Sequence, residues 1–152
     1  MRARVACIAL LAEVVAVASA ACSLKSCKEL GWGNVDKDGH YVDKWPLSSA
    51  LVCGESDFGM EGCSGTLSQA SAAAICSRAG ARLCTSAELL ADETRGTGCN
   101  LDEKYIWTSE ACGADKFFAA WGSSLGGASK KQCLSKAAAS VASARCCADV
   151  AD

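Results

Sequence analysis

TLSQASAAAICSRAGARLCTSAELLADETRGTGC, residues 66–99, opens with the signature of a helix start. Thr66 and Gln69 have the spacing of a capping box, in which a hydroxyl accepts from a free amide of the first turn and the side chain three residues on bonds back to the cap. Gly80 can adopt the left-handed conformation that ends many helices. We therefore predict a helix over residues 68–79.

The same stretch contains a second helix start of the same kind. Thr85 and Glu88 again have the capping-box spacing. This pattern predicts a helix over residues 86–94 that ends near Gly96. Residues 81–84 between the two helices are long enough only for a short strand, so the stretch predicts a helix–strand–helix nucleus.

Residues 1–20 have the three parts of a secretory signal peptide. Arg2 and Arg4 form a basic start, residues 5–17 are mostly apolar, and Ala-Ser-Ala at 18–20 fits a small-residue cleavage site. A retained amphipathic helix or a short anchor is the alternative. No later segment has the ~20 apolar residues that a membrane span needs. We expect a secreted protein, exported through the endoplasmic reticulum, with no membrane span in the mature chain.

The charge balance argues against nucleic acid or an anionic membrane as the partner. The chain of 152 residues has 15 basic and 17 acidic side chains, and loss of two arginines and Glu13 with residues 1–20 leaves a net charge of −3. Such a mild charge does not imply nucleic acid or an anionic membrane as the partner. We expect one domain over 21–152, in which a loop-rich lead-in (21–65) precedes the nucleus and the C-terminal strands (66–152).

Twelve cysteines predict a disulfide-rich domain from an oxidising compartment. Cys7 leaves with the signal peptide, so an odd number of cysteines remains. Either one thiol stays free, or one cysteine pairs between chains, or the signal peptide is cleaved at another position. Zinc is the alternative, but His40 is the lone histidine and no cysteine pair has the spacing of a zinc knuckle. The predicted disulfide cysteines are Cys22, Cys27, Cys53, Cys63, Cys76, Cys84, Cys99, Cys112, Cys133, Cys146 and Cys147.

The last predicted strand, SARCCAD, holds two adjacent cysteines. Neighbouring side chains of a strand point to opposite faces, so Cys146 and Cys147 should bond to two different partners. We expect one of them to pair with Cys76, and Cys112 to pair with Cys133. The cysteines of the lead-in should link it to itself or to the nucleus.

Aromatic and β-branched residues predict two further strands, over residues 105–108 and 117–121, the second ended by Gly122. Trp32, Tyr41 and Trp45 should anchor the lead-in. The predicted core consists of Ile75, Leu83, Leu89, Leu90, Ile106, Trp107, Phe118 and Trp121.

GARLCTSAELL (80–90) and SARCCAD (143–149) resemble the formylglycine-generating-enzyme/sulfatase-modifying-factor family, which has a C-type-lectin-like fold. The ordered motifs VCGESD, GCSG, GARLCT, GTGC, YIWTS and RCCAD resemble a cysteine-rich domain of uncharacterised function in secreted and surface proteins of diatoms and related algae. This resemblance covers residues 27–149. It implies an α+β fold of two helices that flank a small, mostly antiparallel sheet, with the termini close together.

The resemblance does not bring an activity with it. Enzymes of the formylglycine family use a late cysteine pair for copper and oxygen chemistry, whereas Cys146 and Cys147 are adjacent on a strand and suit structural disulfides. Calcium-dependent lectins place a proline in a long sugar-binding loop, whereas Pro46 lies far upstream.

Asn34, Asp36 and Asp38, followed by Gly39, have the alternating oxygens and the glycine of a calcium loop. The twelfth position is Trp45, where a bidentate Glu belongs. A polar turn is therefore the favoured interpretation, and the three residues are kept as a calcium candidate. We expect no other cofactor.

No motif predicts catalysis. Residues 122–126 match the nucleophile-elbow string, but that motif needs a later histidine and His40 precedes it. Asp92-Glu93 and Asp102-Glu103 are sequence neighbours whose side chains diverge, so we expect solvated charges rather than a glycosidase pair.

Two further interpretations concern Arg82 and the tryptophans. Arg82 should pair with a carboxylate such as Glu88. The four tryptophans should lie mostly in the core, with an exposed sugar-stacking ring as the alternative. They are Trp32, Trp45, Trp107 and Trp121.

These patterns together predict a non-catalytic recognition, adhesion or extracellular-matrix module that binds an extracellular glycan or protein ligand. The loops after Cys99 and before Cys63 should carry the binding surface. Two alternatives stay open: a formylglycine-family-like oxidoreductase that uses a free thiol, and a structural subunit of a larger surface or luminal assembly. The sequence does not decide the oligomeric state.

Overall fold

The chain folds into a small α+β structure. The computed structural model describes residues 23–34, 37–38, 40, 45–127 and 129–150. None of the helices in these ranges has both the length and the apolar character needed to cross a membrane. In chain order the elements are α1 (Cys27–Leu30), β1 (Val52–Glu55), α2 (Gln69–Ala79), β2 (Arg82–Leu83), α3 (Ser86–Leu90), β3 (Tyr105–Gly113), β4 (Lys116–Trp121), the 3-10 turn η1 (Ser124–Gly126), β5 (Lys131–Ser135) and β6 (Cys146–Asp149).

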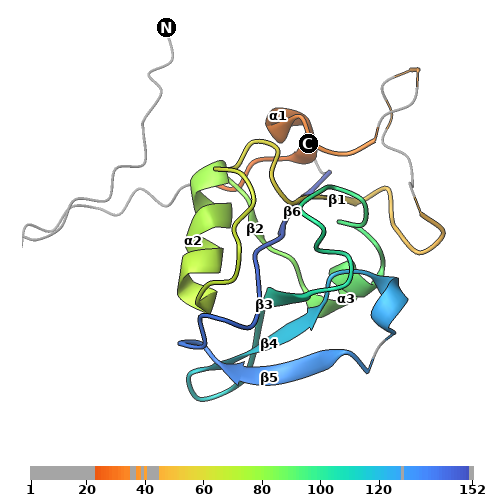
Figure 1. Cartoon of the computed structure of the whole chain (residues 1–152). Helices are drawn as coiled ribbons and strands as arrows, with labels where there is room; N and C mark the ends of the chain where they lie inside the picture. Colours follow the sequence, from red (N-terminus) through yellow and green to blue (C-terminus); the bar gives the residue numbers. More distant parts are fainter. Residues whose placement is uncertain (1–22, 35–36, 39, 41–44, 128, 151–152) are drawn as a thin grey trace, which may run out of the picture.

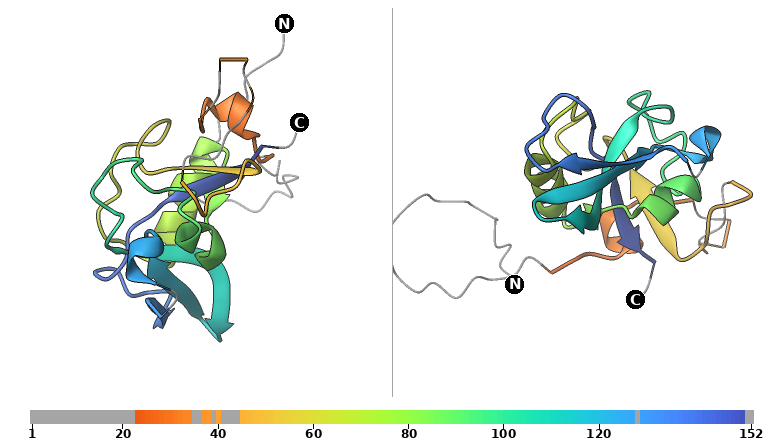
Figure 2. Two further views of the ribbon diagram at one scale, coloured as in Figure 1. Left: turned by 90° about the vertical axis from the view of Figure 1, so that its right-hand side faces the viewer. Right: turned by 90° about the horizontal axis from the view of Figure 1, so that it is seen from below.

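The strands form two antiparallel sheets of three strands each, rather than the single sheet that we predicted. Their orders are β1-β6-β2 and β3-β4-β5. The two sheets lie side by side (Figures 1 and 2) and meet at a parallel bridge between Ile106 and Ser143. The amide of Trp107 donates to the Ser143 carbonyl at 3.0 Å, and the Ser143 amide donates to the Tyr105 carbonyl at 3.0 Å. The chain before β6 therefore joins the sheets.

Helix α2 has the predicted extent but a different cap. The hydroxyl of Ser68, not that of Thr66, accepts from the helix start, from the Ser71 amide at 3.3 Å. The Gln69 side chain instead donates to the Thr108 carbonyl at 3.3 Å and is buried there. The predicted capping box at Thr66 is therefore wrong, because the Gln69 side chain bonds to the Thr108 carbonyl and not back to the helix start. Gly80 ends the helix with a φ of 85°, as predicted.

Helix α3 begins with the predicted capping box. The Glu88 amide donates to Thr85 Oγ1 at 3.2 Å, and the Thr85 amide donates to the Glu88 carboxylate at 2.7 Å. The same carboxylate accepts from both terminal guanidinium nitrogens of Arg82, at 2.9 and 2.7 Å, which confirms that predicted pair. The helix ends at Leu90 rather than at residue 94, because the chain turns at Asp92, where φ is 65°.

Five disulfides link all ten cysteines of the described ranges; Cys22 lies outside them. The two predicted features hold: the adjacent cysteines of β6 have different partners, one of which is Cys76, and Cys112 bonds to Cys133. One bond closes the lead-in on itself and another ties it to the nucleus. The pairs are Cys27–Cys53, Cys63–Cys99, Cys76–Cys146, Cys84–Cys147 and Cys112–Cys133.

The core lies between α2 and the two sheets, with a second cluster beneath α3. Half of the predicted core residues are buried, namely Leu83, Leu89, Ile106 and Trp107. The other half are only partly buried, namely Ile75, Leu90, Phe118 and Trp121. Small side chains and sulfur atoms fill the remaining space, which is why an alanine-rich helix can still pack closely.

The difference between the predicted and observed caps of α2 gives a test. Ser68→Ala should lower the free energy of unfolding by about 1 kcal/mol, the usual cost of a lost cap. Thr66→Ala should stay within ~0.5 kcal/mol, because the Thr66 side chain is exposed and makes none of the helix-start bonds. Chemical denaturation of both oxidised variants measures the difference. A larger loss for Thr66→Ala would contradict the observed cap.

Candidate functional site

Two tryptophans of the predicted set can contact a ligand. Trp32 and Trp107 are 1% and 0% exposed, so they belong to the core. Trp45 and Trp121 are partly exposed. The Trp45 ring is covered by the Arg95 guanidinium at 4.2 Å from the ring centroid, and its indole N–H donates to the Arg95 carbonyl at 3.0 Å. That ring therefore fixes a loop, and Trp121 is the better candidate for ligand contact.

Trp121 lies at the end of β4 in a group that we call the aromatic edge: Tyr105, Trp121, Lys130 and Gln132. Tyr105 pairs with Trp121 across the β3–β4 ladder, and their rings meet edge to face at 5.2 Å between centroids. The Gln132 amide donates to the Tyr105 hydroxyl at 2.9 Å. The site thus combines two partly exposed aromatic rings, one of which carries a hydroxyl, with the polar amide of Gln132.

Backbone geometry fixes the Trp121 ring. A Cβ atom on Gly126 would lie 2.2 Å from Cδ1 of the indole, so the 3-10 turn can pack against the ring only with glycine at that position. The Lys130 ammonium lies over the ring at 4.9 Å from its centroid, and the Trp121 amide donates to the Lys130 carbonyl at 2.9 Å. Such a cation–ring contact is worth about 0.5–1 kcal/mol at an exposed site.

The one charged side chain of the aromatic edge is Lys130, and two further lysines, Lys104 and Lys131, are sequence neighbours of its members. Lys104 and Lys130 are exposed, and within the described residues neither forms an ion pair. Glu103 is exposed on the same turn as Lys104. Lys131, by contrast, is held by Glu110 at 3.5 Å. An anionic group placed over Trp121 would therefore meet the ammonium of Lys130 without having to break an existing salt bridge.

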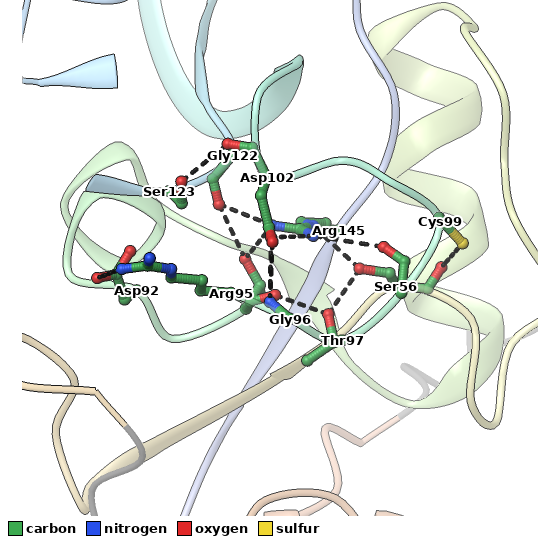
Figure 3. Close-up of polar contacts among 12 residues, drawn as sticks. Ser56, Asp92, Arg95, Gly96, Thr97, Cys99, Asp102, Gly122, Ser123 and Arg145 are labelled. Atoms are coloured by element: carbon green, nitrogen blue, oxygen red, sulfur yellow. Dashed lines mark hydrogen bonds and ion pairs between the residues drawn. The ribbon is translucent and has the colours of Figure 1, made fainter. Parts of the chain in front are cut away.

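A buried arginine supports the loops beside this surface (Figure 3). The Arg145 side chain is 0% exposed, and it donates to Ser56 Oγ at 2.9 Å, to the Gly122 carbonyl at 2.7 Å and to the Asp102 carboxylate at 2.8 Å. A further bond reaches Thr94 Oγ1 at 3.2 Å. Burial lowers the pKa of Arg145, and the charge and hydrogen bond of Asp102 offset part of that shift. No pattern in the sequence singles out Arg145, because its partners lie far from it along the chain.

Asp92 is also buried, which corrects the expectation of solvated charges. Its carboxylate accepts from the amide and the hydroxyl of Ser124, both at 2.8 Å, and it pairs with Arg95 at 3.3 Å. Ser124 belongs to the nucleophile-elbow string, and its hydroxyl is used here to fix a turn. Asp92 and Asp102 are each held by a structural partner.

The structure places part of the predicted calcium loop. Asn34 and Asp38 are exposed, and Asp36 lies outside the described residues. The Lys37 ammonium lies 2.8 Å from the Asp38 carboxylate. The calcium site stays a prediction.

Two groups in the described ranges bring three ligand-type atoms within 4.8 Å of one another. In both groups the two cysteines form a disulfide, Cys63–Cys99 in one and Cys84–Cys147 in the other. The thiolate is the form of cysteine that binds metals. Neither group therefore offers more than one ionised ligand, Asp57 or Glu88.

Comparison with known proteins does not assign the site: no family model matches the chain, and no curated protein or solved structure matches it either.

The Arg145 network gives a second test. Asp102→Asn leaves the buried guanidinium without a carboxylate, and we expect it to lower the free energy of unfolding by about 2–3 kcal/mol. This is less than the ~3–5 kcal/mol of a fully buried pair, because the Asp102 side chain is 33% exposed. Asp149→Asn is the matched control: this carboxylate pairs with Arg82 but is 60% exposed, so the loss should stay within about 1 kcal/mol. Equal losses of stability in the two variants would contradict a stabilising pair between Arg145 and Asp102.

Glu110 gives a test by pH. Burial raises the pKa of Glu110, but hydrogen bonds from Ser86 and the charge of Lys131 outweigh it, so the pKa lies below its ordinary value of 4.5. The charged form therefore stabilises the fold above pH 4.5, and this contribution disappears as the pH falls through the lower folded pKa. The stability difference between wild type and Glu110→Gln should be largest at pH 7 and vanish in acid. A difference that grows in acid would show the opposite shift.

Proposed function

We propose that this chain is a secreted, non-catalytic recognition module. Five disulfides in a compact domain of this size support an extracellular setting, because such bonds persist in oxidising compartments. The proposed fold is C-type-lectin-like. The helix–strand–helix nucleus, the later β3–β4–β5 sheet and a closing strand with two disulfides support it.

The proposed ligand is an extracellular glycan that carries a carboxylate or sulfate group, and the proposed surface is the aromatic edge. The observation that carries this proposal is the partly exposed Trp121 ring with the Lys130 ammonium 4.9 Å from its centroid. Aromatic rings stack on the apolar face of a sugar. An acidic sugar would draw Lys130 from the ring to its own anionic group, so the ring face would open as the ion pair forms.

The alternative of a formylglycine-family-like oxidoreductase needs a free thiol. Cys146 and Cys147 bond to Cys76 and Cys84, which gives each a separate structural partner. Thiol titration of the natively purified, oxidised protein distinguishes the two functions. The recognition module should show at most one free cysteine per chain, whereas the oxidoreductase should show a reactive thiol with copper uptake.

Replacement of Trp121 tests the glycan surface. Trp121→Ala should abolish binding of the intact oxidised protein to acidic polysaccharides on a glycan array, since it removes both the stacking ring and the support of Lys130. Lys130→Gln should keep the ring and weaken binding most at low salt, because screening already reduces exposed charge interactions at high salt.

Trp45→Ala is the matched control, because Trp45 is also partly exposed and also lies beside a cation. It should leave glycan binding unchanged. Loss of binding in both tryptophan variants would indicate general destabilisation, and wild-type protein that binds only neutral polysaccharides would overturn the proposed ligand class.

A further inference from the structure

The outer edge of β5 is open to a further strand. Strand β5 lies at the edge of the β3-β4-β5 sheet, and Figure 1 shows it at the lower border of the molecule. The Trp121 amide donates to the Lys130 carbonyl, and the Lys136 amide donates to the Asp115 carbonyl, both at 2.9 Å. Because hydrogen bonding alternates along an antiparallel pair, the even-numbered residues of 130–136 bond to β4. The odd-numbered residues present their main chains outward, namely Lys131, Cys133 and Ser135.

Two of the outward main-chain groups already have partners. The Lys131 amide donates to the Ser129 carbonyl at 2.9 Å, and the Ser135 carbonyl accepts from the Ala138 amide at 3.0 Å. Nothing in the described ranges bonds to the other four groups, which are the Lys131 carbonyl, the amide and the carbonyl of Cys133, and the Ser135 amide. Cys133 and Ser135 are exposed, so this stretch of the edge is accessible.

The pattern of used and unused groups is complementary to itself. Consider a second copy that runs antiparallel, with its Cys133 opposite the Cys133 of the first. The two cysteines then exchange both main-chain bonds, and each Ser135 amide meets the Lys131 carbonyl of the other copy. The groups that remain, the Lys131 amide and the Ser135 carbonyl, also lie opposite each other, and each is already bonded within its own copy.

Other partners and other registers match this edge less well. An unrelated strand would place one amide and one carbonyl of its own opposite the two used groups, and buried main-chain groups without partners are costly. A shift of the second copy in either direction would place a Cys133 group opposite a used group. The hydrogen bonds therefore favour a second copy in this one register.

We propose that two copies of this chain pair through the outer edge of β5, with a two-fold axis at Cys133. The two three-stranded sheets then join into one continuous sheet. The turns that bond to Lys131 and Ser135 end the strand pair on both sides, so the contact is short. The dimer is therefore weak and dissociates on dilution.

The charges beside β5 give this dimer a distinctive response to salt. In the proposed register Lys130 of one copy lies opposite Lys136 of the other, and like charges directly opposite destabilise a strand pair. Asp115 pairs with Lys136, whereas Lys130 has no ion pair within the described residues. Salt screens this repulsion and should strengthen the dimer. An acidic segment of another protein at the same edge would instead bind best at low salt.

The dimer also has a consequence that rests on the proposed glycan function. Residues directly opposite in an antiparallel pair share a face of the sheet. Lys130 and Gln132 of both copies therefore lie on one face, and with them the two aromatic edges. One acidic polysaccharide chain that contacts both edges would bind more tightly than to a single copy, without any new kind of contact.

The first experiment measures hydrogen exchange and sedimentation equilibrium of the intact oxidised wild-type protein over a range of concentrations. As the dimer forms, exchange should slow at the amides of Cys133 and Ser135, whereas Gln132 and Leu134, already bonded to β4, should change little. The dimer fraction should rise as salt is raised from about 0.01 to about 0.15 M. No glycan is present, so this result is independent of the proposed ligand.

The second experiment compares two variants of Ser135. Ser135→Pro removes an amide that each copy donates across the axis, and an edge strand tolerates proline. Two hydrogen bonds are lost per dimer, so the dissociation constant should rise roughly tenfold or more. Ser135→Thr keeps the amide and should dimerise as wild type does.

The third experiment does not depend on the folding of Ser135→Pro. Cys112→Ser frees the thiol of Cys133 at the axis, where opposite Cα atoms of a hydrogen-bonded pair are ~5.5 Å apart, a separation that a disulfide can span. Mild oxidation should trap a dimer in which Cys133 is linked to Cys133. Cys99→Ser is the matched control, because it frees Cys63, which is also exposed but belongs to no strand, and it should not link Cys63 to Cys63.

Four results would overturn the proposal. They are a monomer at every concentration up to millimolar, a dimer in which the Cys133 and Ser135 amides exchange as in the monomer, a dimer that weakens as salt rises, and equal dimerisation of the two Ser135 variants. If an acetylated and amidated hexapeptide of alternating valine and glutamate protects these amides while the protein stays monomeric, the occupant is a partner segment and the proposal is wrong.

Discussion

Three consecutive residues, Arg145, Cys146 and Cys147, bind the chain together in three directions. Cys146 reaches α2 on one face of β6, and Cys147 reaches Cys84 on the other. The Arg145 side chain enters the loops between the sheets and contacts Ser56 and Asp102 among others. Strand β6 is also the centre of its own sheet. The lead-in, the nucleus and the later strands are therefore all held by one short segment near the end of the described chain.

The buried charge of Arg145 makes this arrangement specific as well as stable. A guanidinium removed from water is costly unless its donors find acceptors, and here they meet hydroxyls, carbonyls and one carboxylate. Those acceptors lie on segments near residues 56, 94, 102 and 122, which have no regular structure to align them. A loop held by hydrogen bonds to a fixed arginine loses less entropy on binding a ligand than a free loop does.

Most local signals were predictable from the sequence, whereas most long-range choices were not, apart from the pairing of Cys112 with Cys133 and of Cys76 with a cysteine of β6. Thr85 and Glu88 form their box because both partners lie within one turn, and the strand alternation of Cys146 and Cys147 fixes their opposite directions. Thr66 and Ser68 are both hydroxyls before the same helix, so the contact of Gln69 with Thr108 decides between them. Arg145 and Asp92 look like surface charges in the sequence, because their partners lie far along the chain.

The aromatic edge is connected to the Arg145 network through the chain that follows β4. Gly122 comes directly after Trp121, and its carbonyl accepts from Arg145 at 2.7 Å. The next turn, η1, packs against the indole at Gly126 and is held at Ser124 by the buried carboxylate of Asp92. The ring on which the proposed glycan would stack is therefore positioned by buried polar contacts on both sides of Ser123. A ring fixed in this way loses little conformational entropy when a ligand binds, which favours recognition by a rigid surface.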